Sequence, residues 1–158
     1  MTNPSIPVVE AVTTPAEMNA QPFATETKTL FRCVSEHDFD PLAALCDDDF
    51  GIIDLGTEGQ NVVVETREEW ENWFHTLFAK LDAMQATTRT EIEKYRALVN
   101  GDMGYSVVDF CQILDVQGQE GRFYCVVTII WKRVGDEWKE SRWHCSLIRT
   151  EMADWLET

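Results

Sequence analysis

The stretch that determines the fold is residues 103–149, which read MGYSVVDFCQILDVQGQEGRFYCVVTIIWKRVGDEWKESRWHCSLIR. Apolar and polar residues alternate along it in three runs, which are separated by turns that contain glycine. Because successive side chains of a strand point to opposite faces of a sheet, this alternation is typical of β-strands. The stretch therefore predicts three long antiparallel strands, and such a sheet needs helices packed against its apolar face.

The clearest helix signal precedes this stretch. Thr66 and Glu69 form a Thr-x-x-Glu capping box, which is typical of the start of a helix. The large apolar residues that follow recur at helical spacing and are Trp70, Trp73, Phe74, Leu77, Phe78 and Leu81. A helix with one continuous apolar face is predicted, and we expect that face to lie on the sheet.

Shorter elements complete the predicted order. Thr25 is a suitable cap for a first helix that ends near Ser35. Asn100 and Gly101 are typical of a hairpin turn, which adds a fourth long strand to the sheet. The remaining expected elements are a short helix at 42–46, short strands at 50–55 and 61–64, a strand at 87–99 and one helical turn at 151–156.

The length of 158 residues fits one domain with a single core. Residues 1–21 contain three prolines and no periodic apolar face, so we expect them to form a flexible arm. The domain is then expected at 22–150, and residues 151–158 form a C-terminal tail. Six tryptophans and eight phenylalanines indicate either a densely packed aromatic core or an aromatic pocket.

The charge of the chain narrows the classes of partner. A net charge of −15 and a pI near 4.4 argue against nucleic acid and anionic membranes, whose binding depends on clustered Lys and Arg. No apolar run approaches the roughly 20 residues of a membrane span. The segment before Lys28 has no Lys or Arg, and its apolar run is too short for a signal peptide, so we expect a cytoplasmic protein.

The cysteines and histidines predict neither disulfides nor a metal site. The five cysteines are odd in number and contain no Cys-x-x-Cys pair, which favours reduced structural thiols. His37, His75 and His144 share no ligand spacing with one another or with a cysteine. We therefore expect no metal and no other cofactor.

The predicted order and the closing hairpin resemble a known superfamily. Ile130-Trp131-Lys132-Arg133, a turn, Trp138 and then His144-Cys145-Ser146 are similar to the closing hairpin of the association domain of calcium/calmodulin-dependent protein kinase II. Residues 25–148 as a whole resemble the nuclear-transport-factor-2-like proteins, which include SnoaL-like cyclases and ketosteroid isomerases. The resemblance implies an α+β, cystatin-like fold: a cone-shaped, curved antiparallel sheet wrapped around a long helix, with a pocket inside.

The likeness to ketosteroid isomerases implies a general base. Asp40, the apolar run 42–45, the acidic run 47–49 and then Asp54 show the spacing by which those enzymes reach their catalytic carboxylate. A carboxylate at the mouth of an aromatic pocket has a raised pKa, as proton abstraction beside a carbonyl requires. Leu30, however, takes the place of their oxyanion-hole tyrosine, so we do not expect a strict isomerase.

The likeness to the association domain implies further pocket residues. In its register Asp109 and Ile129 occupy places where that domain has pocket arginines, so the pocket would suit a cation, a hydroxyl or a proton transfer. The candidate catalytic residues are Asp54, Asp109 and His144, and the candidate pocket residues are Trp73 and Ile129. Each polar candidate also has a structural interpretation.

Asp54 can be a turn residue that binds its local backbone. Asp109 can be paired with Arg142, Arg89 or Lys94, because a charged residue in mid-strand must be paired or exposed. His144 can satisfy a neighbouring strand or a dimer contact. These alternatives remain open at the level of the sequence.

Two functions follow from these residues. The first is a pocket protein that binds a small apolar molecule, either as an isomerase-type or cyclase-type proton-transfer enzyme or as a carrier. The alternative is an oligomerisation module without chemistry. In both cases we expect a homodimer or a higher homo-oligomer, because the long strands carry large apolar residues on both faces and one helix covers only one of them.

Overall fold

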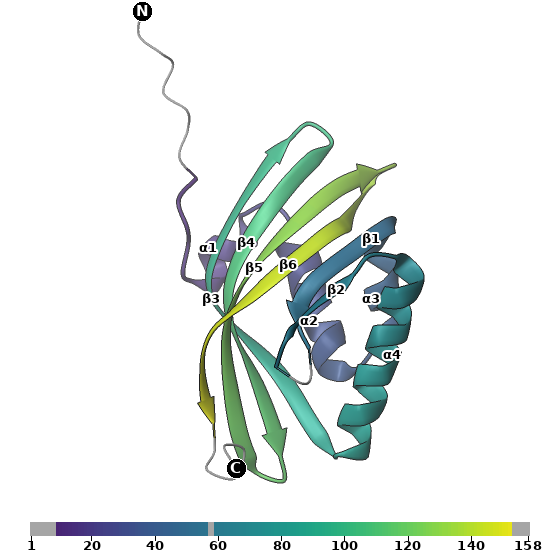
Figure 1. Cartoon of the computed structure of the whole chain (residues 1–158). Helices are drawn as coiled ribbons and strands as arrows, with labels where there is room; N and C mark the ends of the chain where they lie inside the picture. Colours follow the sequence, from purple (N-terminus) through teal and green to yellow (C-terminus); the bar gives the residue numbers. More distant parts are fainter. Residues whose placement is uncertain (1–8, 57–58, 153–158) are drawn as a thin grey trace, which may run out of the picture.

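The computed structural model describes residues 9–56 and 59–152, which form helices and one sheet (Figure 1). In chain order the elements are α1 Pro15–Asn19, α2 Ala24–Glu36, α3 Phe39–Ala44, β1 Cys46–Leu55, β2 Asn61–Val64, α4 Arg67–Ala83, β3 Ala86–Asn100, β4 Met103–Val116, β5 Gln119–Val134 and β6 Glu137–Met152. The predicted α+β order is therefore confirmed, with the long helix between the short and the long strands.

The sheet has the strand order β2-β1-β6-β5-β4-β3. Strands β3 to β6 form the predicted antiparallel meander, whereas β1 pairs with β6 in parallel, so the sheet is mixed. Register shifts in the β3–β4 and β5–β6 pairings mark bulges, which bend strands. The sheet curves strongly, and α2, α3 and α4 lie on its inner side (Figure 1).

The core fills the inner face of the sheet. Trp131 is fully buried there, stacks on Phe23 with 5.4 Å between ring centroids, and donates its indole N–H to Ser106 Oγ at 2.9 Å. A side chain at Gly104 would collide with the Phe23 ring, so this strand position needs glycine for the close approach. The aromatic stack closes this part of the cone.

Helix α4 begins where the capping box predicts. Thr66 Oγ1 accepts the backbone N–H of Glu69 at 3.2 Å, while the Glu69 carboxylate accepts the N–H of Glu65 at 3.3 Å, one residue before the expected partner. Trp70 and Phe78 are buried against the rest of the core. The other large apolar residues of the helix are half-buried, because they border the cavity described below.

The two ends of the described chain differ from the sequence-based expectations. Val12 forms a two-bond bridge with Tyr95 of β3, and the helix α1 follows, so this part of the expected flexible arm lies against the domain. At the other end β6 continues to Met152, which corrects the expected helical turn for residues 151–152. Residues 1–8 and the rest of the tail, 153–158, lie outside the described residues.

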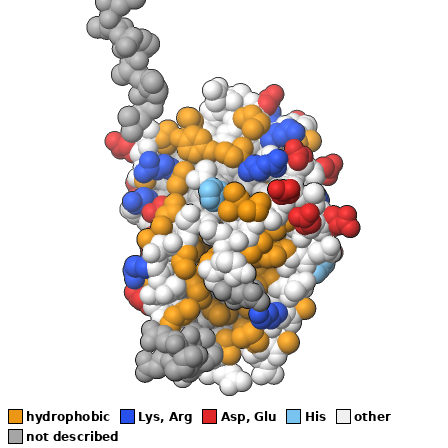
Figure 2. All heavy atoms as spheres, in the orientation of Figure 1, with side chains coloured by type: hydrophobic (Ala, Val, Ile, Leu, Met, Phe, Trp, Pro, Cys, Tyr) orange, Lys and Arg blue, Asp and Glu red, His pale blue; other side chains and the backbone are white. Residues whose placement is uncertain are grey.

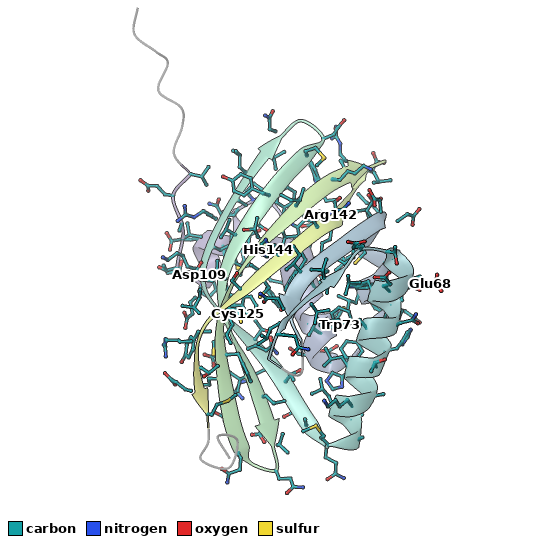
Figure 3. All side chains as sticks on the ribbon, in the orientation of Figure 1. Glu68, Trp73, Asp109, Cys125, Arg142 and His144 are labelled. Atoms are coloured by element: carbon teal, nitrogen blue, oxygen red, sulfur yellow. The ribbon has the colours of Figure 1, made fainter. Side chains whose placement is uncertain are left out.

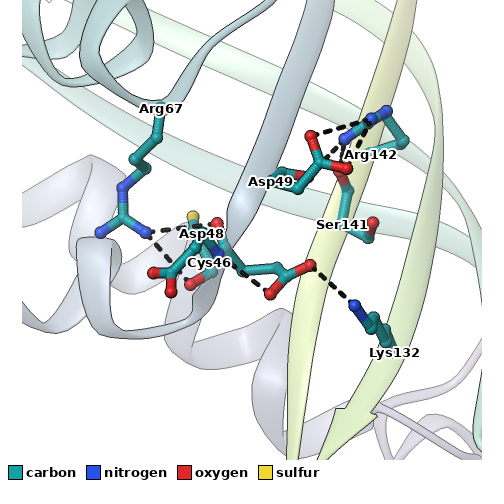
Figure 4. Close-up of polar contacts among 8 residues, drawn as sticks. Cys46, Asp48, Asp49, Arg67, Lys132, Ser141 and Arg142 are labelled. Carbon is teal, nitrogen blue, oxygen red and sulfur yellow. Dashed lines mark hydrogen bonds and ion pairs between the residues drawn. The ribbon is translucent and has the colours of Figure 1, made fainter.

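Strand β1 also begins earlier than predicted. The short helix ends at Ala44, and the acidic run 47–49 belongs to the strand and not to a turn. Cations on the sheet pair with this run: Lys132 with Asp47 at 3.4 Å and Arg142 with Asp49 at 3.4 Å (Figure 4). These pairs attach the start of β1 to the meander.

Candidate functional site

A cavity of about 270 Å³ lies between the inner face of the sheet and the helices α2, α3 and α4. Its wall is largely apolar, as is usual for a site that binds a small molecule. The aromatic side chains of the wall are Phe31, Phe50, Trp70, Trp73, Phe74, Phe110, Phe123 and Trp143. Among the described residues that line it, none is Lys or Arg.

Asp54 is one of two carboxyl groups in this wall. Its Oδ2 accepts the indole N–H of Trp143 at 2.9 Å, and its Oδ1 accepts the backbone N–H of Leu55 at 2.6 Å. Burial raises the pKa of Asp54 above its ordinary range, although these two donors and the Cys145 thiol oppose the rise. The side chain points inward because β1 alternates, with Ile52 and Asp54 both lining the cavity.

Glu140 is the second carboxyl group, and the sequence-based analysis missed it. It is 2% exposed, its side-chain hydrogen-bond partner among the described residues is the Cys46 thiol at 3.7 Å, and burial raises its pKa to about 8. Along β6 it has the same parity as Arg142 and His144, which are exposed. The register places one extra residue, Ser141, between the partners of Trp131 and Ile130, and this bulge turns Glu140 inward.

Neutral polar groups complete the wall. Thr88 Oγ1 is buried without a hydrogen-bond partner among the described residues, and Gln112 Oε1 accepts the hydroxyl of Thr90 at 2.7 Å. Cys125 and Cys145 also line the cavity, and the hydrogen bond with Cys125, together with burial, raises the pKa of Cys145. The wall thus offers hydroxyl, amide and thiol groups as hydrogen-bond donors to a ligand.

The structure brings together two of the five predicted site residues. Asp54 and Trp73 line the cavity, and Ile129 is fully buried in the core but is not part of the cavity wall. Asp109 and His144 lie on the outer face of the sheet, whereas Trp73 lies on α4 (Figure 3).

The expected placement of Asp109 and His144 in the pocket is therefore corrected. Phe110 and Gln112 line the cavity, so by alternation Asp109 points outward, where its carboxylate lies 4.0 Å from the ammonium of Lys94. His144 is exposed, and its neighbours in the sheet are Thr128 and Ile53. Neither side chain can reach a ligand in the cavity, since the sheet lies between them.

Comparison with known proteins identifies the family of the chain. The family model of the SnoaL-like domain matches residues 27–150. The chain is a member of the SnoaL-like family. A search of the curated proteins finds no match to this SnoaL-like sequence.

Solved structures agree with this SnoaL-like fold. The chain is similar to a candidate scytalone dehydratase from Novosphingobium aromaticivorans, with 13% identity, a TM-score of 0.70 and coverage of 87% and 88% of the two chains. It is also similar to a hexachlorocyclohexane dehydrochlorinase, with 18% identity, a TM-score of 0.64 and coverage of 82% of this chain and 87% of the other. A third similar structure is a candidate calcium/calmodulin-dependent protein kinase II association domain from Xanthomonas campestris. Its identity is 16%, its TM-score is 0.69, and the match covers 91% of this chain and 98% of the other. At these identities the likeness shows the fold, which is nuclear-transport-factor-2-like and cystatin-like.

Two further findings bear on the SnoaL-like cavity. Within residues 9–56 and 59–152, no group of three or more His, Cys, Asp and Glu side chains is arranged to hold a metal ion. In the same part of the chain, no helix has the length and apolar character needed to cross a membrane. The chemistry that the cavity offers through its own side chains is proton transfer by carboxyl groups in an apolar surrounding.

Proposed function

We propose that this SnoaL-like protein binds a small, largely apolar molecule in the cavity and that Asp54 accepts a proton from it. The observation that carries the proposal is the position of Asp54: an acid within an aromatic wall, held by the Trp143 indole and the Leu55 N–H. The names of two structural neighbours, a dehydratase and a dehydrochlorinase, are those of elimination reactions and support the proposal at the level of reaction class.

The surroundings of Asp54 suit a base that removes a proton from carbon. Burial destabilises the carboxylate form and raises the pKa of Asp54, so the ionised group is a stronger base than an exposed aspartate. The Trp143 and Leu55 donors hold the carboxylate in one orientation, which lowers the entropic cost of reaching the transition state. Leu30 lines the same cavity without a donor group, so stabilisation of a developing oxyanion falls to groups such as the Thr88 hydroxyl.

The test uses 5-nitrobenzisoxazole, an apolar probe that opens to a coloured cyanophenolate when a base removes its ring proton. We expect the protein to accelerate this opening, and Asp54→Asn to lower the rate about 100-fold or more, as for the loss of a general base. Asp109→Asn is the matched control, because it removes a carboxylate on the outer face of the sheet. The rate should follow the titration of Asp54 measured by carboxyl-carbon NMR. Equal rates for Asp54→Asn and the wild type would refute the proposal.

We further propose that the protein associates as a homodimer through the outer face of the sheet. Figure 2 shows hydrophobic side chains spread over this face between charged groups. Val126 and Ile130 of β5 are half-buried there, and Val63 of β2 is 59% exposed. The alternative function is association through this face without any catalysis. It predicts that Asp54→Asn opens the probe at the same rate as the wild type.

A further inference from the structure

One carboxyl group of the cavity wall has no cationic partner among residues 9–56 and 59–152. Glu140 is fully buried in the wall, and within the described part of the chain its side chain is hydrogen-bonded to the Cys46 thiol alone. A buried carboxyl group with one weak donor is costly, and an apolar side chain of similar size would avoid the cost. Because the carboxyl group borders a cavity, a ligand is available as the missing partner.

The cations near Cys46 are already engaged. Arg67 donates to the backbone carbonyls of Cys46 and Asp47 (Figure 4). It also donates to the carbonyl of Ala43 and to the Glu71 carboxylate.

Lys139, the next residue along β6, donates to the carbonyl of Ala44 and pairs with Glu137 at 3.0 Å. With Lys139 and Arg67 directed to other partners, the groups that face Glu140 from its surroundings are the Cys46 thiol on β1 and the apolar wall.

We propose that the cavity takes an amine carried on an apolar skeleton, with the ammonium group paired to the carboxylate of Glu140. The aromatic wall favours the same ligand, because the faces of rings such as Phe50 and Trp70 attract cations. The net charge of −15 draws cations towards the protein and repels carboxylates. The proposal rests on the proposed ligand-binding function and names the class of molecule that the cavity binds.

The proposal makes binding depend on pH in a defined way. Burial keeps Glu140 protonated in the free protein at neutral pH, since its pKa is about 8, and an alkylammonium ion arrives with its own proton. The complex shares one proton between the two groups, so binding releases the other. Affinity is therefore expected to rise about tenfold per pH unit between pH 6 and 8 and to level off above pH 8.

The experiment is titration calorimetry of the full chain with 2-phenylethylamine and with its neutral analogue 2-phenylethanol, in two buffers that differ in ionisation enthalpy. At pH 7 we expect the amine to bind about tenfold more tightly than the alcohol and to release close to one proton. Glu140→Gln should lose both the preference and the proton release while still binding the alcohol. Glu137→Gln, an exposed acid on the same strand, is the matched control and should behave as the wild type.

Each other result has a defined meaning. If the alcohol binds as tightly as the amine, this proposal fails and the proposed ligand-binding function stands. If Asp54→Asn removes the amine preference while Glu140→Gln keeps it, the ammonium binds at Asp54 and the assignment to Glu140 is wrong. If neither molecule binds, both proposals fail. Where Glu140→Gln does not fold, Asp54→Asn decides the matter: retained amine preference and proton release support Glu140, and their loss rejects it.

Discussion

At the scale of single residues, Glu140 couples the stability of the fold to pH. In the unfolded chain a glutamate ionises near 4.5, whereas the buried Glu140 ionises at about 8. Between these values the unfolded state binds fewer protons than the folded state, so the contribution of Glu140 is fully favourable below pH 4.5 and is lost as the pH rises towards 8. We expect the free energy of unfolding to fall by about 1.4 kcal/mol per pH unit in this range.

Urea denaturation of the wild type and of Glu140→Gln between pH 5 and 9 measures this coupling. The substitution removes the titration, so the difference in free energy of unfolding between the two proteins should grow with pH and reach about 5 kcal/mol near pH 8. The exposed Glu137→Gln should follow the wild-type curve. Parallel curves for Glu140→Gln and the wild type would show that Glu140 is ionised in the folded state.

The inward position of Glu140 could not be predicted from the sequence. Asp109 and His144 were predicted in the pocket, but Phe110 and Gln112 take the inward positions of β4, and the bulge at Ser141 exchanges the two sides of β6. Asp54 was predicted in the pocket from the spacing shared with ketosteroid isomerases, and the alternation of β1 from Phe50 to Asp54 turns its side chain into the cavity. The sequence carried no signal for the extra residue, because a bulge depends on the pairing of two strands and not on either alone.

At the scale of elements, the start of α4 depends on its cap. Thr66 Oγ1 is the side-chain acceptor for the N–H of Glu69, which otherwise has no partner within the helix. Thr66→Ala should therefore lower the free energy of unfolding by about 1 kcal/mol in urea denaturation. Thr76→Ala, at an exposed position within the same helix, should leave stability unchanged or raise it slightly, because alanine is the better helix former. Equal effects of the two substitutions would contradict the capping role.

Elements were predicted where their signal is local. The capping box and the apolar spacing located α4, and alternation with glycine turns located β3 to β6, because each pattern lies within one segment. The parallel pairing of β1 with β6 and the bridge between Val12 and Tyr95 join segments far apart in the chain. Such pairings depend on how the whole cone closes, so no local pattern predicts them.

At the scale of the whole molecule, the curved sheet separates two surfaces with different properties. The inner face encloses the cavity with Asp54 and Glu140, while the outer face carries Asp109 and His144. A ligand on one face and a second copy on the other would therefore act independently. The cone also explains why residues expected at one site are divided, since neighbours along a strand face opposite sides.

The outer face leads to the prediction for the assembled protein. Across the sheet, Val63, Ile53, His144, Thr128 and Val107 form one row of neighbours. The adjacent row contains Ile130, which is half-buried in the single chain. We expect two copies to pair face to face and bury well over 1,000 Å², as stable dimers do. Light scattering at micromolar concentration should give about twice the 18.2 kDa of one chain.

Ile130→Glu tests this arrangement, because a symmetric interface would bury two added carboxylates, one from each copy, while the neighbouring cation Arg142 is already paired with Asp49. We expect the variant to be monomeric and to keep the amine preference of the wild type, since Ile130 points away from the cavity. Thr76→Glu adds the same charge on the exposed side of α4 and should remain dimeric. A monomeric wild type would reject the dimer. A dimeric Ile130→Glu would place the contact on another surface, because a buried carboxylate pair at the centre of this face could not persist.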